Sequence, residues 1–477
     1  MEKKFLLNFF RVITSIIFPL ITLPYVTRAL QPSGFGKVDF ANSIIAIFIM
    51  FSTLGIPTYG VRLVAQNRHD SIKLSQNVKQ LLMLQILGVI ICYVVFFICL
   101  FLYSKMANEK LLFLILSLSI LMNGVGIDWF FSGMEEYGYI TLRNGIIQIL
   151  SFCMILLLIK TPSDYIIYAG ITVFSSVGIN VLNLFHLRNR ISWSGKFTAN
   201  VLPHIKGSIV FFVLILIGTS LTKLESIMIG SFMNYQDVGI YAAANKIIQC
   251  VIGVFTGIGM TFLPTLICLK NDDILKFNIV LEKSVDFIYF VTLPTCVILF
   301  ILAPQIIDLV VGHKFYLSVT PFRILVAIIF ITSLNVVVGN QVFIAFHKES
   351  YGAFPILTLA ILSPLLNYML IHYFGVSGAS TALLLTSIIS AIIQLYLAMK
   401  INRIRLFRKH HLKYILASIL MAFIVLYCIN LNIPLLAIIV ISMIGYGLVL
   451  IAMREYFVIM YVERVLLFIK TKLMSNN

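Results

Sequence analysis

The chain has 477 residues, of which 60% are hydrophobic and only 11% are charged, and its mean hydropathy is +1.04. A soluble globule of this size would need a largely apolar surface, so the composition excludes that class and indicates a protein embedded in a lipid bilayer. The formal net charge of +17 allows a nucleic-acid partner in principle, but the positions of the basic residues argue against one.

The apolar stretches predict an all-α integral membrane protein, because about 20 apolar residues of helix cross a bilayer core about 30 Å thick. The first stretch follows Met1-Glu2-Lys3-Lys4 and resembles a secretory signal. It continues for about twenty residues without a small-residue cleavage site, so we interpret it as an uncleaved span. In chain order, about fourteen spans are expected near 5–28, 38–62, 80–103, 110–132, 139–159, 164–187, 206–231, 238–267, 280–302, 321–346, 351–373, 376–399, 412–430 and 434–453.

The Lys and Arg residues are concentrated in every second loop. With the N-terminus placed in the cytoplasm, the cytoplasmic segments hold 25 of the 35 basic residues, the outer segments hold seven, and three lie within spans. This asymmetry follows the positive-inside rule and predicts that both termini are cytoplasmic. No G-x-x-x-x-G-K-[ST] loop occurs, so any transport would draw its energy from an ion gradient or from the gradient of the substrate.

A weak internal repeat divides the chain. The segments 34–42 and 237–245 match at an offset of 203, which aligns Gly36 with Gly239 and Asn42 with Asn245. Both segments follow an odd-numbered span, so the halves would be parallel repeats related by an axis along the membrane normal. The expected organisation is an N-terminal half with spans 1–6, a C-terminal half with spans 7–12, two further spans, and a cytoplasmic amphipathic tail, at 1–190, 203–400, 410–453 and 454–477.

Span one carries polar groups that the membrane should exclude. Arg11 lies about a third of the way along it, where an arginine costs about 2.5–3.5 kcal/mol to insert. Arg11 therefore either lines a cavity or reaches the cytoplasmic head groups by snorkelling. Pro19 and Pro24 each remove a backbone hydrogen bond, and are either hinges or static kinks.

Span two has charged residues at both ends. Asp39 and Asn42 lie at its start, and an Arg28–Asp39 pair across the short outer loop is expected. Arg62 closes the span on the cytoplasmic side, where it is either a topogenic charge or part of a cavity.

Spans seven and eight hold the most central ionisable groups. Lys223 and Glu225 point about 200° apart on one helix, so each needs a partner elsewhere, and Lys246 is a candidate partner for Glu225. Asn245 and Gln249 form a polar stripe beside Lys246. The group is interpreted either as a functional cavity or as a structural network between helices.

Asp128 lies near the inner end of span four. It is either a proton or cation site, or the partner of Arg143 in the next loop. No catalytic constellation, metal-ligand spacing or cofactor motif is found, so the sequence predicts a transporter rather than an enzyme.

Several motifs, loose one by one but specific in their order, cover nearly the whole chain up to the tail. They are Pro24-Tyr25-Val26-Thr27-Arg28-Ala29-Leu30 with Gly34-Phe35-Gly36, Gly55-Ile56-Pro57-Thr58-Tyr59-Gly60-Val61-Arg62, Asp128-Trp129-Phe130-Phe131-Ser132-Gly133-Met134-Glu135, Ile229-Gly230 with Val238-Gly239-Ile240-Tyr241, and Gly339-Asn340-Gln341. With these motifs the chain resembles the Wzx-type oligosaccharide flippases of the polysaccharide transporter family, in the superfamily that also holds the MATE drug exporters.

The resemblance implies a MATE-like bundle of two six-helix lobes around a central cavity, followed by two C-terminal helices. It also implies a substrate, an undecaprenyl-diphosphate-linked oligosaccharide repeat unit. The family moves such units across the bacterial cytoplasmic membrane, from the inner to the outer leaflet, for O-antigen or capsule synthesis. A polysaccharide polymerase and a chain-length regulator are the implied protein partners.

A diphosphate cannot cross the hydrocarbon unaided, so a cationic, hydrated cavity would lower the barrier. The side chains available for the substrate cavity are Arg11, Arg28, Asn42, Arg62, Lys223, Asn245, Lys246, Gln249 and Gln341, those for ion coupling are Asp39, Asp128 and Glu225, and those for a hinge are Pro19 and Pro24. Alternating access of the two lobes would follow. A MATE-like drug or metabolite exporter, a flippase for the peptidoglycan lipid precursor and a membrane-embedded polymerase or acyltransferase stay open as alternatives.

Overall fold

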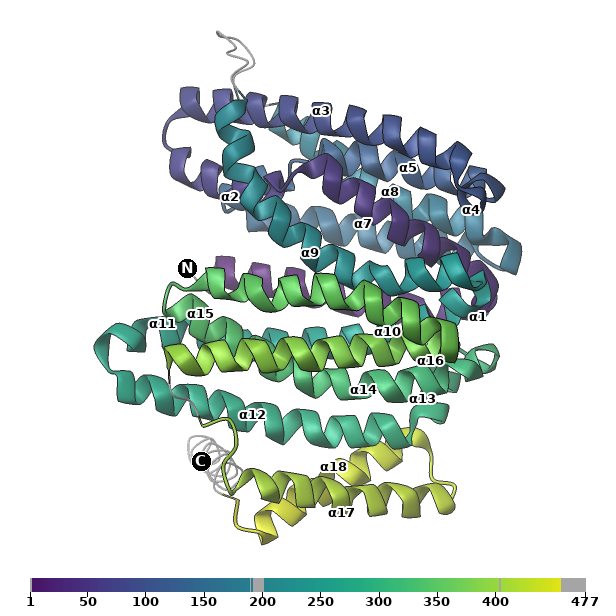
Figure 1. Cartoon of the computed structure of the whole chain (residues 1–477), viewed down its shortest axis with the longest axis vertical. Coiled ribbons are helices and arrows are strands. Elements are labelled where there is room, and N and C mark those ends of the chain that lie inside the picture. Colours follow the sequence, from purple (N-terminus) through teal and green to yellow (C-terminus); the bar gives the residue numbers. More distant parts are fainter. Residues whose placement is uncertain (1, 189, 192–200, 403–404, 456–477) are drawn as a thin grey trace, which may run out of the picture. The chain divides into compact units, whose positions relative to one another are not determined.

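The computed structural model describes the backbone of all residues except 1, 189, 192–200, 403–404 and 456–477, and side chains also except 2–17, 214–222, 271 and 349. The described residues are almost entirely helical and contain no strand (Figure 1). The predicted all-α membrane protein is therefore confirmed. Arg11 and the amphipathic tail fall outside the described side chains.

The chain forms two compact units, and the first consists of Met1–Lys246, Val310–Ser318 and Ile356–Leu383. Within it α1 packs against α5, α7 and α9, and α5 packs against α8. Its elements are α1 (Glu2–Thr53), α2 (Ile56–Asn67), α3 (Ser71–Leu102), α4 (Ser104–Asn108), α5 (Lys110–Gly124), α6 (Asp128–Gly133), α7 (Tyr137–Leu158), η1 (Pro162–Asp164), α8 (Tyr165–Leu187), α9 (Leu202–Phe232) and η3 (His313–Ser318), with parts of α10 (Tyr235–Gly259) and α16 (Ala353–Ile401).

The second unit consists of Ile247–Leu309, Val319–Pro355 and Leu384–Asn477. Here α12 packs against α14 and α17, and α17 forms an antiparallel pair with α18 (Figure 1). Besides the remainders of α10 and α16, its elements are η2 (Met260–Phe262), α11 (Leu263–Asp272), α12 (Ile274–Ile301), α13 (Ala303–Val310), α14 (Val319–Leu334), the π-helical η4 (Asn335–Asn340), α15 (Gln341–Ala345), η5 (Glu349–Gly352), α17 (His411–Asn430) and α18 (Leu435–Ala452).

Among the described residues, eleven helical stretches are long and apolar enough to cross a membrane. Two of them, Phe18–Asn67 and Ser350–Ile401, each cover two of the expected spans. The expected seventh span lies on α9, where part of the side chains falls outside the description. The count of fourteen spans stays a prediction.

The two longest helices are interrupted by a single residue of left-handed φ. In α1 this is Gln31 (φ 58, ψ 174), which precedes Pro32 and so cannot adopt the helical conformation without a clash with the proline ring. In α16 it is Gly375 (φ 57, ψ −132), a conformation that glycine adopts without a Cβ penalty. Pro19 and Pro24 were the expected bends, but the break in α1 lies beyond them.

The offset of 203 recurs in the geometry. Asp70 caps α3 by accepting the N–H groups of residues 72 and 73, and Asp273 caps α12 by accepting those of residues 275 and 276. Both helices begin earlier than the spans expected at 80 and 280, because their first turns contain lysine and other polar residues among apolar ones and so lie outside the continuous apolar stretch. The pKa of each capping carboxyl is lowered, chiefly because the charged form accepts backbone N–H groups.

The aligned glycines also contact each other. A Cβ on Gly36 would overlap the carbonyl oxygen of Tyr235 and lie 2.6 Å from the nitrogen of Gly239. A Cβ on Gly239 would in turn overlap the carbonyl oxygen of Pro32, and Pro32 and Tyr235 are themselves 203 residues apart. The second part of α1 and the start of α10 therefore cross in a reciprocal contact that only glycine permits at both positions.

Candidate functional site

Next to this crossing, one lysine and one aspartate form an ion pair in the first unit. Lys246 on α10 places Nζ 3.5 Å from Oδ1 of Asp39 on α1 and 4.4 Å from the ring centroid of Phe35. Ser226 on α9 donates its hydroxyl to the other oxygen of Asp39, at 2.9 Å. Asp39 is 10% exposed and Lys246 is 40% exposed, so the ammonium is accessible while its partner is buried.

Glu225 lies beside Ser226 and is fully buried. It faces Asn367 and Ser363 on α16, and Tyr241 on α10 lies close to both Glu225 and Asp39. Among the described residues, neither carboxyl oxygen of Glu225 has a hydrogen-bond partner, and the same is true of the Tyr241 hydroxyl. Unpartnered polar atoms in a buried site are costly, which makes this a place where a proton or cation would be stabilised.

We call this group the central polar cluster. It consists of Asp39, Glu225, Ser226, Tyr241, Lys246, Ser363 and Asn367, contributed by α1, α9, α10 and α16. Small residues allow the close helix approach that assembles it, since Gly230 on α9 packs against the ring of Phe40 on α1. The cluster combines an accessible cation with a buried carboxyl group, which can bind an anion and a proton respectively.

Two pairings expected from the sequence differ in the structure. Lys246 pairs with Asp39 rather than with Glu225, and Asp39 contacts Lys246 and Ser226 rather than Arg28. The reason is the glycine crossing, which brings α10 next to the start of the second part of α1. Sequence spacing within one helix contains no information on that crossing.

The other expected cavity residues are distributed over several elements, and their role stays a prediction. Arg28 and Arg62 are exposed, and Asn42 and Lys223 are half-buried. On α10, Asn245 is half-buried beside Lys246 and Gln249 is exposed. In the second unit, Gln341 is fully buried, and its amide donates to the Gly259 carbonyl at 2.7 Å.

Of the two interpretations of Asp128, the structure shows the pairing with Arg143. Its Oδ1 lies 2.9 Å from Nη1 of Arg143, which is buried, and Asn183 also donates to it. Arg143 further contacts Asn183 and Asn144, so its guanidinium is held by several acceptors. The pairing of Asp128 with Arg143 is thus confirmed.

Comparison with known proteins places the chain in a family. Residues 2–269, more than half of its length, match the family model described as "Polysaccharide biosynthesis protein". The chain belongs to this family. Two relatives named "Putative O-antigen transporter" are 22% identical over 78% of this chain and 90% of the Escherichia coli (strain K12) protein, and 21% identical over 83% of this chain and 99% of the Shigella dysenteriae protein.

The fold of this polysaccharide biosynthesis protein is that of known membrane transporters. The lipid II flippase MurJ in its inward closed conformation superposes with a TM-score of 0.78 over 95% of this chain and 99% of MurJ, at 15% identity. An inward-facing MATE multidrug transporter of the MOP superfamily gives 0.63 over 81% of this chain and 94% of the transporter, at 13% identity. The predicted MATE-like fold is confirmed, and the relatives are transporters rather than enzymes, as expected.

One contact of this family member, a lysine that caps a helix of the first unit, was not predicted from the sequence. Lys105 on α4 donates to the carbonyls of Gly230 and Met233, at the C-terminal end of α9. Tyr103 and Ser231 share a hydrogen bond of 2.9 Å nearby. Free carbonyls at a helix C-terminus attract cations, so Lys105 caps α9 from the loop between α3 and α5. Burial lowers the pKa of Lys105.

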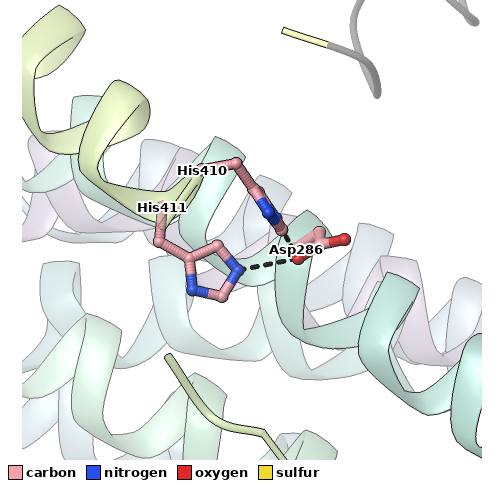
Figure 2. A group of neighbouring side chains, drawn as sticks. All are labelled: Asp286, His410 and His411. Atoms are coloured by element: carbon pink, nitrogen blue, oxygen red, sulfur yellow. Dashed lines mark hydrogen bonds and ion pairs between the residues drawn. The ribbon is translucent and has the colours of Figure 1, made fainter. Parts of the chain in front are cut away.

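A second group missed by the sequence lies in the second unit. His410 and His411, at the start of α17, both point at Asp286 on α12 (Figure 2). Their Nε2 atoms lie 2.9 and 2.7 Å from the same carboxyl oxygen, while Arg408 contacts the other oxygen and also Glu282. From the sequence alone, the basic residues of this loop indicated only that it lies on the cytoplasmic side.

These three side chains have ligand atoms within 4.8 Å of one another, as in some metal sites. Nδ1 of His411, however, accepts the backbone N–H of Arg408 at 3.2 Å. Its Nε2 therefore carries the proton and donates to Asp286, so that neither nitrogen is available to a metal. His411 is also stacked on Tyr289, with ring centroids 4.1 Å apart. We interpret the group as an ionic contact that holds α17 against α12.

Proposed function

We propose that the protein is a flippase of the bacterial cytoplasmic membrane with both termini in the cytoplasm. Its substrate is an undecaprenyl-diphosphate-linked oligosaccharide repeat unit, moved from the inner to the outer leaflet for O-antigen or capsule synthesis. The observation that carries this proposal is Lys246, an accessible cation held by Asp39 inside a helix bundle of the polysaccharide biosynthesis family.

The physical reason is the cost of moving a diphosphate through hydrocarbon. A protein cation replaces part of the hydration that the phosphates lose, and a lysine does this as a point charge. The Asp39–Lys246 pair keeps the ammonium oriented while no phosphate is present. A diphosphate can then compete with Asp39 for the same ammonium, which makes the binding reversible.

Alternating access of two lobes, residues 1–190 and 203–400, would carry the head group across while the lipid tail stays in the membrane. Glu225 is our candidate for ion coupling, because its buried carboxyl group lacks a hydrogen-bond partner among the described residues. A proton taken up from one side would neutralise it. Transport that persists when both the proton and the sodium gradients are collapsed would remove this part of the proposal.

The test uses a strain in which the gene is deleted and then restored as a variant. Without the protein, we expect lipid-linked oligosaccharide to accumulate and surface glycan to be lost. Lys246→Gln is compared with the double variant Asp39→Asn/Lys246→Gln, in which no buried charge is left unpaired. If the lysine binds substrate, both variants lose surface glycan; if it only neutralises Asp39, the double variant regains it.

Expression and membrane level of each variant are measured in parallel, with Lys314→Gln as a matched control because Lys314 is an exposed lysine outside the cluster. The proposal is wrong if Arg11→Ala, Lys223→Ala and Lys246→Ala, made one at a time, all leave surface glycan at normal levels.

The fold shared with MurJ and with MATE transporters supports two other substrates, the peptidoglycan lipid precursor and drugs. The deletion strain separates them. Loss of wall synthesis would indicate the peptidoglycan precursor, and drug sensitivity with normal surface glycan would indicate an exporter. A polymerase partner would be expected only for the oligosaccharide.

A further inference from the structure

The C-terminal end of α9 is bound by the connection between α3 and α5, and all residues of this contact belong to the first unit. Tyr103 and Ser231 share a hydrogen bond of 2.9 Å. Lys105 donates to two carbonyls at the end of α9, that of Met233 at 2.8 Å, and Tyr235 donates its hydroxyl to the Lys105 carbonyl at 3.2 Å. The connections after spans three and seven lie on the same side of the membrane, which the proposed topology places outside. We call these residues the outer contact of α9.

The N-terminal end of α9 is bound to α2 and α3 through a buried histidine. His204 lies with Nδ1 3.1 Å from the Tyr59 hydroxyl and with Nε2 2.7 Å from the amide oxygen of Gln80. Because an amide oxygen only accepts, Nε2 carries the proton, and Nδ1 accepts the hydrogen bond of Tyr59. A neutral histidine therefore satisfies both partners. We call these three residues the inner contact of α9.

The two contacts lie at opposite ends of a helix that also contributes to the central polar cluster. The 31 residues of α9 span about 45 Å at 1.5 Å per residue. Glu225 and Ser226 of the cluster lie between the two contacts along the same helix. Both contacts consist of hydrogen bonds near the ends of the membrane spans, where water can replace the bonds when the segments separate. Such contacts can break and form again at a small net cost.

We propose that the outer and inner contacts of α9 are the two gates of the transport cycle, and that they open one at a time. Separation of His204 from Tyr59 and Gln80 admits the substrate from the inside. Separation of Lys105 and Tyr103 from the end of α9 releases it to the outside. The inference rests on the proposed transport by alternating access, but it does not depend on which substrate is carried. With both contacts made, the structure corresponds to a state between loading and release.

The experiment measures from which side of the membrane a cysteine near the cluster can be modified. Asn245→Cys on α10, beside Lys246, is the reporter, in a full-length protein whose seven native cysteines are replaced by alanine. A membrane-impermeant maleimide is applied to spheroplasts, where it reaches the outer side, and to inverted membrane vesicles, where it reaches the inner side. The rate of labelling is measured in both preparations.

Weakening the outer contact should shift the labelling to the outside. Lys105→Met removes two hydrogen bonds, so labelling from the outside should rise about threefold or more and labelling from the inside should fall, since the two open states share one equilibrium. Tyr103→Phe keeps the ring and removes one bond, so it should act in the same direction, and it keeps the test decisive if Lys105→Met folds poorly. Lys110→Met is the matched control, because Lys110 is an exposed lysine at the start of α5 whose ammonium lies 5.1 Å from the ring centroid of Phe101.

Weakening the inner contact should shift the labelling in the opposite direction. His204→Phe keeps a ring next to Tyr59, whose ring centroid lies 5.9 Å away, but it cannot form either hydrogen bond. Labelling from the inside should therefore rise about threefold or more, and labelling from the outside should fall. Tyr59→Phe removes one of the two bonds and should act in the same direction. His69→Phe is the matched control, because His69 is an exposed histidine between α2 and α3.

Opposite shifts by the outer and inner variants would support the two gates. Labelling that changes equally from both sides, or that stays unchanged, would show that the contacts only stabilise the fold and would overturn the proposal. A shift at one end alone would overturn the assignment of the other end.

These results are separable from the proposed function, because the labelling requires no glycan substrate. If the deletion strain accumulates lipid-linked oligosaccharide but the labelling does not change sides, only the assignment of the gates is wrong. If the labelling shifts as expected but no lipid-linked species accumulates in the deletion strain, the proposed substrate is wrong.

Discussion

Replacing Gly36 by alanine should separate α1 from α10 and disrupt the central polar cluster. The added Cβ would lie 2.6 Å from the nitrogen of Gly239 and overlap the carbonyl oxygen of Tyr235, whereas an ordinary contact begins at 3.4 Å. Since both neighbours are backbone atoms, the helices must move apart by about 1 Å or more, and overpacking of this kind costs about 1–3 kcal/mol, occasionally more. The same movement lengthens the Asp39–Lys246 contact of 3.5 Å.

The assay is thermal unfolding of the full-length protein in detergent, together with surface glycan in the restored deletion strain. Gly145→Ala is the matched control, because it also places alanine in a helix interior but has no atom within 4 Å of the added Cβ. It should be neutral or more stable by about 0.5–1 kcal/mol, since alanine favours helix over glycine. Gly36→Ala should unfold at a lower temperature and reduce surface glycan. Equal unfolding temperatures of the two alanine variants would show that the crossing of α1 and α10 does not require glycine at position 36.

Three further outcomes are expected. Arg143→Met should lower the unfolding temperature more than Asp128→Asn does, because Arg143 is buried with several acceptors whereas Asp128 is 56% exposed. Equal effects of the two substitutions in the same melting assay would contradict this expectation. Asp286→Ala should destabilise the protein by about 2–4 kcal/mol, because the substitution removes the acceptor that Arg408 and the two histidines share. Protease cleavage of the loop before α17 should then become faster. Backbone N–H groups lower the pKa of the Asp70 carboxyl in the folded protein. Its capping contribution to stability is therefore present above the pKa of the unfolded state and is lost as the pH falls through the pKa of the folded state. In thermal melts recorded as the pH is lowered towards that range, Asp70→Asn should lose less stability than the wild type.

Much of the fold could be predicted from hydropathy, because membrane helices must be long and apolar. The eleven apolar helical stretches of the described residues, α18 included, follow from this rule. The pairing of Asp128 with Arg143 was one of two alternatives, because the two residues are only 15 positions apart in the sequence. The offset of 203 was visible as a few matched residues, and the caps at Asp70 and Asp273 show that it describes real geometry. Hydropathy does not predict the first turns of α3 and α12, in which charged and polar residues are mixed with apolar ones and which extend each helix beyond its apolar stretch.

The candidate site was harder to predict because its contacts join distant segments. Asp39 and Lys246 are 207 residues apart in the sequence, and their pairing depends on a glycine crossing rather than on any motif around either residue. Similarly, His411 appears in the sequence as one more group in a basic loop. Only the packing of α17 on α12 brings it to Asp286.

The crossing at Gly36 and Gly239 also constrains how the two halves can change over time. Each glycine provides space for the backbone of the other half, so a bulkier residue on one side cannot be tolerated through an adjustment confined to that side. A chain ending after the first half would present a small-residue strip without a counterpart. Such a fragment would leave Gly36 without the backbone of Tyr235 and Gly239 against which it packs.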